Sequence, residues 1–404
     1  MMSKGTKRLT KSIPNSPVKY SSAAEAVGSS VDLLTEILLR VPAKPLIRFK
    51  CVSKHWRALI SDSVFGSNHT RRNPSPPVSG MYVYDRWVFT GKVNDQYSPL
   101  TLGGRRGTNS VPPLSFLHEA MSHTYQRITI SRSSNGLILC CLGYWNYTYI
   151  VCNPTTQKFT TLPKSGVTPS RHEFLKEEPF LCFDPTKSPY YKVMVVTNDY
   201  SQDVSQLAIY TSECASWKIV SLEARVPNYA RGAIWNGGII WIDSREVHRL
   251  DLNTEKLTIG SLAQGQNGPN NVPEYFGECG GHLLLLQLTK SHDAMEVKEL
   301  EMDRDDFCWT VRDDFCWIVR YQVDLSSFGI MPNRSRCPIS MISVVKGAKE
   351  NDLSLVFHNQ DKVFSYNLEC RTVKVLCELC PENIAQRILL YEVSYQFVES
   401  LSHV

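Results

Sequence analysis

The sequence predicts an α+β chain of two structural units, a small three-helix bundle near the N-terminus and an all-β, propeller-like domain after it. One passage, residues 29–65, carries helical patterns. Most of the later chain alternates short runs of Val, Ile, Tyr, Phe and Trp with turns of Gly, Pro, Asn and Asp. These strand blocks recur about every 45 to 55 residues, which suits four-stranded propeller blades. A large sandwich or an open antiparallel array is the alternative.

We expect four segments along the chain: a disordered leader at 1–28, the helical unit at 29–68, a linker at 69–80 and the β domain at 81–401. The leader is rich in Ser, Lys, Ala and Pro and lacks apolar periodicity. Three prolines stiffen the linker: Pro74, Pro76 and Pro77.

The helical unit is predicted from caps, breakers and spacing. Ser29 is expected to cap the first helix, with Asp32 completing a capping box. Pro42 would end this helix, Pro45 fits the first turn of the second, and Ser53 can cap the third. The first helix has a broad apolar face at positions i, i+1, i+4, i+5 and i+8: Leu33, Leu34, Ile37, Leu38 and Val41. A unit this small cannot bury all its apolar groups internally, so it meets either a partner or the domain that follows.

The order of residues from Asp32 to Phe65, DLLTEILLRVPAKPLIRFKCVSKHWRALISDSVF, resembles the F-box, above all in its plant form. The resemblance implies docking onto the Skp-type adaptor of a cullin–RING ubiquitin ligase through a largely apolar surface. It casts eight residues as helical core or adaptor contacts: Leu34, Ile37, Leu38, Val41, Pro42, Leu46, Val52 and Trp56. The family usually opens with Leu-Pro, whereas this chain has Ser29 and Ser30, a departure that removes some contact area.

The β domain carries a second resemblance. Ordered blocks such as NGLILC, YIVCNPTTQKFTTLP, IYTSECASWKIV and GAIWNGGIIWI look like the plant F-box-associated domain over most of Ser131 to Leu401. The glycine pairs Gly237-Gly238 and Gly280-Gly281 are similar to those of kelch repeats, so a kelch-type propeller is expected. The resemblance implies a role in recruiting substrates and supplies no catalytic residues.

One feature falls outside the family pattern. DDFCWTVR, from Asp305 to Arg312, is followed at once by DDFCWIVR, from Asp313 to Arg320. One strand made of both copies would be unusually long. Either the copies form two strands of a hairpin, or one copy is extruded as a loop. We interpret the repeat as a duplication without a required function.

Composition and motifs exclude several classes of protein. The net charge of +5 over 404 residues comes without a dense basic stripe, so nucleic acid is not an expected partner. No apolar run approaches a membrane span. The 13 scattered cysteines fit a reducing compartment, cytoplasmic or nuclear, and the C-x-x-C at Cys377 and Cys380 lacks a second ligand pair. Catalytic and phosphate-binding motifs are missing, so neither an enzyme nor a metal or cofactor is expected.

The resemblances together imply a substrate-recognition subunit of an SCF-type cullin–RING ubiquitin ligase, which binds the adaptor through its F-box and an unknown target protein through its β domain. One alternative is a carbohydrate or small-ligand module that stacks sugars on Trp145, Trp235 or Trp241. Another is an F-box protein without a degradation target. Length and polarity suggest three target-binding segments: Asn94 to Asn109, Gly166 to Glu178 and Gln264 to Pro273.

Overall fold

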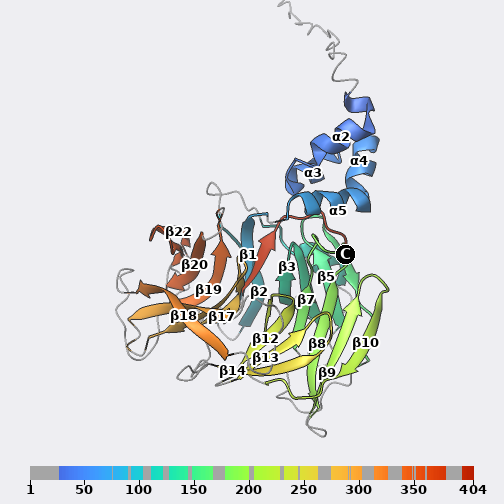
Figure 1. Cartoon of the computed structure of the whole chain (residues 1–404). Helices are drawn as coiled ribbons and strands as arrows, with labels where there is room; N and C mark the ends of the chain where they lie inside the picture. Colours follow the sequence, from blue (N-terminus) through green and yellow to red (C-terminus); the bar gives the residue numbers. More distant parts are fainter. Residues whose placement is uncertain are drawn as a thin grey trace, which may run out of the picture.

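The structure is a computed structural model of the whole chain. It describes residues 27–74, 76–89, 92–102, 111–121, 127–143, 148–166, 178–199, 204–227, 232–243, 246–262, 274–289, 291, 293–302, 314–325, 339–347, 349, 352–359, 362–378 and 394–404. A helical unit lies at one end of a larger β domain (Figure 1). Among these residues no helix has the length and apolar character that crossing a membrane requires.

The helical unit contains α2 (Val31–Leu38), α3 (Ala43–Phe49), α4 (Lys54–Ser61) and α5 (Ser63–Arg72). The prediction that Ser29 caps the first helix was wrong by one residue, because the hydroxyl of Ser30 accepts from the Leu33 amide at 3.4 Å. Ser53 caps α4 as predicted, accepting from the Trp56 amide at 3.1 Å.

Two further helix boundaries differ from the sequence prediction. Pro42 does not end α2, which stops at Leu38; it is the N-cap of α3 instead. A fourth helix was not expected: α5 begins after Asp62, whose carboxylate accepts from the Val64 and Phe65 amides at 2.9 and 3.0 Å. This helix covers part of the segment that the sequence assigned to the linker, and the first strand begins at Val78.

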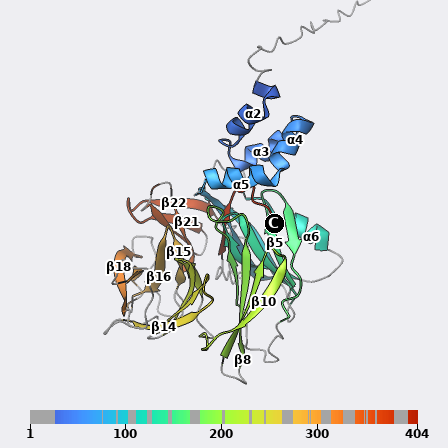
Figure 2. The same cartoon turned by 45° about the vertical axis from the view of Figure 1, so that its right-hand side comes forward.

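The strands of the described residues form six blades, numbered here along the chain (Figures 1 and 2). Blade 1 contains β3 (Ile128–Ser134), β4 (Leu137–Leu142), β5 (Thr148–Asn153) and β6 (Lys158–Thr161). Blade 2 contains β7 (Glu178–Cys182), β8 (Lys192–Asp199), β9 (Val204–Thr211) and β10 (Ser216–Ser221). Blade 3 contains β11 (Ala233–Trp235), β12 (Gly238–Ile242), β13 (Glu246–Asp251) and β14 (Leu257–Leu262).

Blade 4 contains β15 (Tyr275–Cys279), β16 (His282–Leu288), β17 (Ala294–Met302) and β18 (Asp314–Asp324). Blade 5 contains β19 (Ile339–Lys346), β20 (Leu353–Asn359), β21 (Lys362–Asn367) and β22 (Val373–Glu378). Blade 6 combines β23 (Ser394–Val398) with β1 (Val78–Phe89) and β2 (Lys92–Thr101), and a short helix, α6 (Ser115–Met121), follows β2. The outer strands of blades 3 and 4 also touch, because β14 pairs in parallel with β18.

The ring is closed by the first and last strands of the described β domain. Strand β23 pairs antiparallel with β1, so that Val78 lies opposite Val398 and Tyr82 opposite Tyr395. The inner strand β23 in turn contacts β3 of blade 1. Because β2 occupies Lys92–Thr101, the first part of the predicted target-binding segment Asn94 to Asn109 is a strand.

The hydrophobic core lies between the blades. One apolar cluster fills each of the six contacts between neighbouring blades in the described part of the chain. Strand β4 of blade 1 contributes side chains to two of these clusters. Leu137 and Leu139 point toward blade 2, whereas Ile138 and Cys140 point toward blade 6. Both faces of an inner strand are buried, so the strand reads as a continuous apolar run. This pattern confirms the predicted propeller.

The blades repeat one polar turn between their third and fourth strands. At its start a side-chain oxygen of Asn153, Thr211, Asp251 or Asn367 accepts backbone amides two or three residues ahead. The fifth residue of each turn has a positive φ between 52° and 59°. Blade 4 carries the tandem copies in this part of its sequence: β18 begins at Asp314, within the second copy, and the first copy lies outside the described residues.

Candidate functional site

Five large aliphatic side chains are exposed in the described part of the helical unit. Val31, Leu33 and Ile37 on α2 and Val52 in the turn before α4 are 50%, 53%, 49% and 61% exposed, and Val64 on α5 is 64% exposed. We call the first four residues, which belong to α2 and the turn before α4, the outer helical surface. Exposed aliphatic side chains gathered on one small unit are typical of a protein contact site.

The structure separates the eight predicted contact residues by burial. Leu34, Leu38 and Leu46 are at most 2% exposed and pack in the core of the helical unit. Ile37, Pro42 and Val52 are exposed, while Val41 and Trp56 are half-buried. The Trp56 ring meets Phe49 edge-on, with 5.7 Å between ring centroids. Only part of the predicted set therefore faces solvent.

Sequence reasoning missed Val31 as a surface residue and assigned Leu33 to the apolar face without a contact role. Leu33 and Ile37 are four residues apart and lie on one side of α2, whereas Leu34 and Leu38 lie on the side that packs inward. An apolar face this broad exceeds what one small core can bury. The width of this apolar face was the sequence signal for an exposed surface, because one stripe of it packs in the core and the other is left in contact with solvent.

Polar contacts hold the helices that carry this surface. The Glu36 carboxylate on α2 accepts from Arg72 of α5 at 3.0 Å and from Arg40 at 3.1 Å. The Arg72 hydrogen bond, with the Arg40 contacts, lowers the pKa of Glu36. His69 of α5 is buried, with Nε2 at 2.8 Å from the Val41 carbonyl, and burial lowers its pKa. These contacts tie α5 to the C-terminal end of α2.

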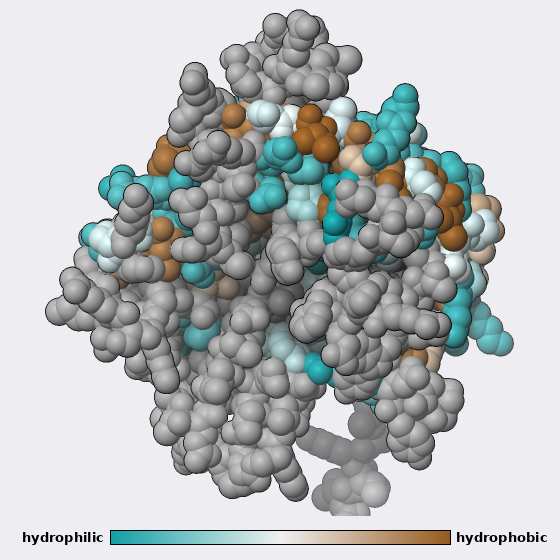
Figure 3. Space-filling view, turned by 90° about the horizontal axis from the view of Figure 1, so that it is seen from below, coloured by the Kyte–Doolittle hydropathy of each residue, from teal (hydrophilic) through white to brown (hydrophobic). Residues whose placement is uncertain are grey.

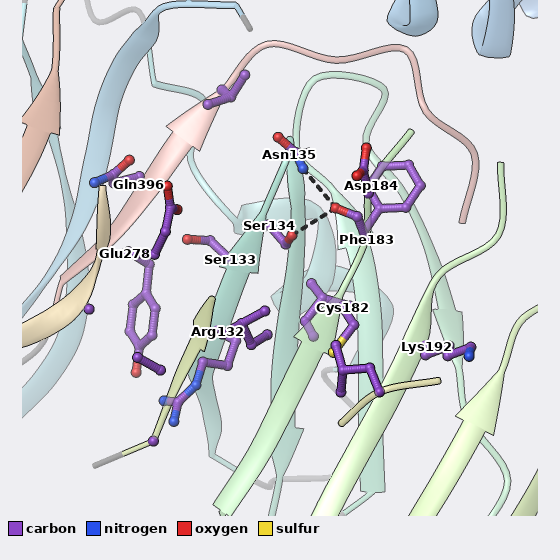
Figure 4. A pocket seen from close by; sticks show the side chains of 18 of the residues that line it. Arg132, Ser133, Ser134, Asn135, Cys182, Phe183, Asp184, Lys192, Glu278 and Gln396 are labelled. Atoms are coloured by element: carbon purple, nitrogen blue, oxygen red, sulfur yellow. Dashed lines mark hydrogen bonds between the residues drawn. The ribbon is translucent and has the colours of Figure 1, made fainter. Parts of the chain in front are cut away.

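A cavity of about 1400 Å³ runs among the inner strands of the β domain. Figure 4 shows its wall near Ser134 and Asn135, whose side chains donate to the Phe183 carbonyl at 3.1 and 2.7 Å. Gln396 donates to the Val344 carbonyl at 2.7 Å, and Glu278 accepts from the Gly281 amide at 2.7 Å. These polar groups bind neighbouring backbone, so their hydrogen bonds serve the fold.

The described residues contain no cluster of three or more His, Cys, Asp or Glu side chains that could hold a metal ion. Two of the tryptophans considered for sugar stacking have structural contacts. Trp241 is 0% exposed and donates to Glu178 at 3.0 Å, and Trp235 donates to the Gly281 carbonyl at 2.8 Å. Trp145 lies outside the described residues. The buried indole of Trp241 cannot stack on a sugar, so this part of the carbohydrate hypothesis was wrong.

The three predicted target-binding segments fall largely outside the described residues, which omit 103–110, 167–177 and 263–273. Figure 3 shows the face of the β domain turned away from the helical unit, where the described residues mix hydrophilic and hydrophobic side chains.

Comparison with known proteins follows the two structural units. A model of the F-box domain matches residues 30–68, and a model described as the F-box associated beta propeller domain matches residues 94–297. F-box protein At5g07610 of Arabidopsis thaliana is 27% identical over 428 residues, covering 95% of this chain and 94% of the relative. F-box only protein 8 of the same plant is 30% identical over 208 residues, covering 48% of this chain and 63% of the relative.

The solved structure of the SapL1 lectin in complex with alpha methyl fucoside is 12% identical, covers 77% of this chain and 99% of its own, and has a TM-score of 0.35. At that score the likeness says nothing about ligands.

Proposed function

The chain belongs to the F-box proteins that carry an F-box-associated β-propeller domain, and from that premise we propose that it is the substrate-recognition subunit of an SCF-type cullin–RING ubiquitin ligase. Proteins of this family act as adaptors rather than as enzymes. In the proposed role the F-box binds a Skp-type adaptor and the propeller holds a target protein, in the cytoplasm or the nucleus. The thioester chemistry belongs to other subunits.

The outer helical surface supports adaptor binding. Covering a half-exposed Val, Leu or Ile stabilises a complex by about 1 kcal/mol each. Four such residues on one unit, Val31, Leu33, Ile37 and Val52, offer a contact without any buried charge. Leu34, Leu38 and Leu46 act indirectly, because they hold the helices that present this surface.

The proposed contribution of this chain is geometric. A receptor that binds adaptor and target together raises the local concentration of target lysines near the charged ubiquitin carrier and reduces the entropic cost of their encounter. The connections that follow β6, β14, β18 and β22 are longer than the five-residue turns between third and fourth strands. Such connections on a rigid scaffold commonly bind partners, so we assign target binding to the face that carries them.

The decisive test is co-purification with a Skp-type adaptor. We expect the double variant Leu33→Asp, Ile37→Asp to weaken adaptor binding about 100-fold or more, because both charges would be buried in the contact. The variant should keep its helical circular dichroism, since both positions are exposed. Leu38→Asp is a poor test, because Leu38 is 1% exposed and its replacement would unfold the unit.

A matched control is available on the propeller. Val373 and Val375 on the outer strand β22 are 49% and 46% exposed, close to the values of Leu33 and Ile37. Val373→Asp with Val375→Asp should leave adaptor binding unchanged. If the wild-type chain does not bind the adaptor, or if the F-box variant binds as tightly as the control, the proposal is wrong.

Target recruitment needs its own experiment. Proximity labelling in plant cells, with and without proteasome inhibition, should reveal proteins that accumulate beside the wild-type chain only when degradation is blocked. Beside the variant Leu33→Asp, Ile37→Asp, which should bind the target but not the adaptor, the same proteins should be labelled without inhibition, because this chain no longer leads them to degradation. Labelled proteins whose abundance is the same with and without inhibition would instead indicate an F-box protein without a degradation target.

A further inference from the structure

Residues 399–404, which we call the clasp, follow β23 and lie between the helical unit and blade 1. Leu401 is 3% exposed and belongs to the same apolar cluster as Leu34, Leu38 and Phe65 of the helical unit. Part of the F-box core is therefore supplied by a segment more than 300 residues away in the sequence. On the other side, Val404 packs against the cluster between blades 1 and 2.

Two glycines let the clasp lie against both units. A Cβ on Gly66, inside α5, would come within 2.9 Å of the Leu401 carbonyl oxygen. A Cβ on Gly136, in the β3–β4 turn, would lie 2.3 Å from the Cβ of Ser400. Glycine inside a helix costs about 1 kcal/mol relative to alanine. The close approach of the clasp backbone gives a physical reason for Gly66 in α5.

The amide of Asn153 fixes the clasp to blade 1. Its Nδ2 donates to the Ser400 carbonyl at 3.0 Å and to the Ser402 carbonyl at 2.8 Å, and the residue is 0% exposed. On the helical side, the hydroxyl of Ser402 lies 3.3 Å from that of Thr70 on α5. The hydroxyls of Ser400 and Ser402 are 2.7 Å apart. A buried hydrogen-bond network therefore runs from blade 1 through the clasp to the F-box.

The repeated turn of the propeller shows that this amide is not needed for the turn itself. In blade 1 the Asn153 Oδ1 accepts the Thr155 amide at 2.9 Å; in blade 3 the carboxylate of Asp251 accepts the Asn253 and Thr254 amides at 3.0 and 2.9 Å. An aspartate thus builds the same turn. Only a side chain with an N–H can also donate to two clasp carbonyls.

We propose that the clasp joins the F-box and the propeller into one rigid body, with Asn153 as the positioning residue that fixes their relative orientation. This inference rests on the proposed function for its purpose, because a fixed orientation holds a bound target at a set distance from the adaptor. The two units are then connected twice within blade 6: by residues 73–77, which lead into β1, and by the clasp, which follows β23.

The test measures the distance between the units in the full chain without adaptor. Spin labels are attached to genetically encoded keto residues at the exposed positions His55 on α4 and Glu369 in blade 5, and pulsed electron resonance gives the distance distribution. We expect a single narrow distribution for wild type. Asn153→Asp should at least double its width, because the variant keeps the turn oxygen and loses both donors to the clasp.

The control Asp251→Asn makes the reverse exchange in the equivalent turn of blade 3 and should leave the distribution narrow. Leu401→Ala, which removes the apolar anchor, gives a second and independent variant and should broaden it as well. Near-ultraviolet circular dichroism reports whether the propeller remains folded in each chain. If folded Asn153→Asp and Leu401→Ala chains both give distance distributions as narrow as that of wild type, the clasp does not position the F-box and the inference fails.

Failure of this inference is distinguishable from failure of the proposed function. A wild-type chain with a narrow distribution that binds no Skp-type adaptor would retain the rigid body and contradict the ligase role. A wild-type chain that binds the adaptor but shows a broad distance distribution would support the ligase role and contradict the rigid body.

Discussion

A single carboxylate, that of Glu178, links three blades. It accepts from Arg132 of blade 1 at 2.6 Å, from the Gly232 amide at 3.0 Å and from the Trp241 indole of blade 3 at 3.0 Å. The Arg132 guanidinium also lies over the Phe180 ring, 4.9 Å from its centroid. Gly232 allows this packing, because a Cβ there would come within 2.6 Å of the Trp241 nitrogen.

We therefore predict that Glu178→Ala destabilises the propeller by about 2 to 3 kcal/mol, since it leaves a partly buried guanidinium and an indole N–H without their acceptor. Urea denaturation followed by tryptophan fluorescence measures the change. Glu255→Ala is the control: it breaks an ion pair with Lys218, which is 65% exposed, and such pairs contribute about 0.5 kcal/mol. Equal losses in the two variants would contradict a special role for Glu178.

We expect His358 to make the unfolding free energy depend on pH. It is 7% exposed on β20, and burial lowers its pKa from 6.5 to about 4. Between these values the unfolded chain binds a proton that the folded chain does not, so the unfolding free energy falls as the pH falls from 6.5 toward 4. Above pH 6.5 the side chain is neutral in both states and this stability is fully present.

The expected result is that His358→Gln reduces the loss of unfolding free energy between about pH 6.5 and 4.5 by roughly 2 kcal/mol relative to wild type. Urea denaturation of both chains across this range provides the measurement. Parallel pH profiles for the two chains would show that another group causes the acid sensitivity.

At the scale of elements, the tandem repeat lies at a hairpin that can be shortened. Strand β17 pairs with β18 up to Met302 opposite Phe315. Deleting residues 305–312 would leave four residues between that last pair, a normal hairpin length. The eight deleted residues are an even number, so the inward and outward faces of β18 keep their order.

We predict that the chain lacking Asp305 to Arg312 melts within about 2 °C of wild type, because β17 and β18 keep every described pair. Differential scanning calorimetry checks this. Deleting residues 313–320 should give the same result, since the first copy would supply the same sequence apart from Thr310 in place of Ile318. A fall of more than about 5 °C in both chains would show that the duplication stabilises blade 4.

Elements that depend on local sequence were predicted well. Ser53 was identified as a cap from its own residue type, and the glycine pairs at Gly237 and Gly280 were identified from their similarity to kelch repeats. The shift from Ser29 to Ser30 at α2 is a choice between adjacent equivalent caps, which the sequence does not determine. The roles of Leu34 and Leu33 could not be separated either, because periodicity gives the width of an apolar face and packing decides which edge is buried.

The sequence patterns did not predict contacts between segments that are distant in the chain. Nothing local to β23 indicates that it pairs with β1, and nothing around Leu401 indicates that it completes a core formed by residues 34–65. These contacts follow from closure of the ring, which brings the end of the last strand beside the start of the first. At the scale of the whole molecule, closure therefore decides where the F-box sits.

Ring closure also predicts how truncation affects the molecule. Joining segments about 300 residues apart costs roughly 5 kcal/mol of chain entropy, which β23 offsets through its pairing with β1 and through Phe397, 1% exposed beside Tyr82. We predict that a chain ending at residue 398 keeps its propeller melting within about 5 °C of wild type. A chain ending at residue 393 loses the inner strand of blade 6 and should melt at least about 10 °C lower.

Calorimetry of the two truncated chains separates the clasp from the closing strand. The longer chain lacks only the clasp, so it should keep the propeller transition and lose cooperativity between that transition and the unfolding of the F-box. The shorter chain exposes the unpaired edge of β1, and exposed strand edges promote aggregation. It should therefore also scatter light on heating. If both chains melt at the same temperature, β23 does not hold the ring closed, and the six blades must be stabilised by the apolar clusters between them alone.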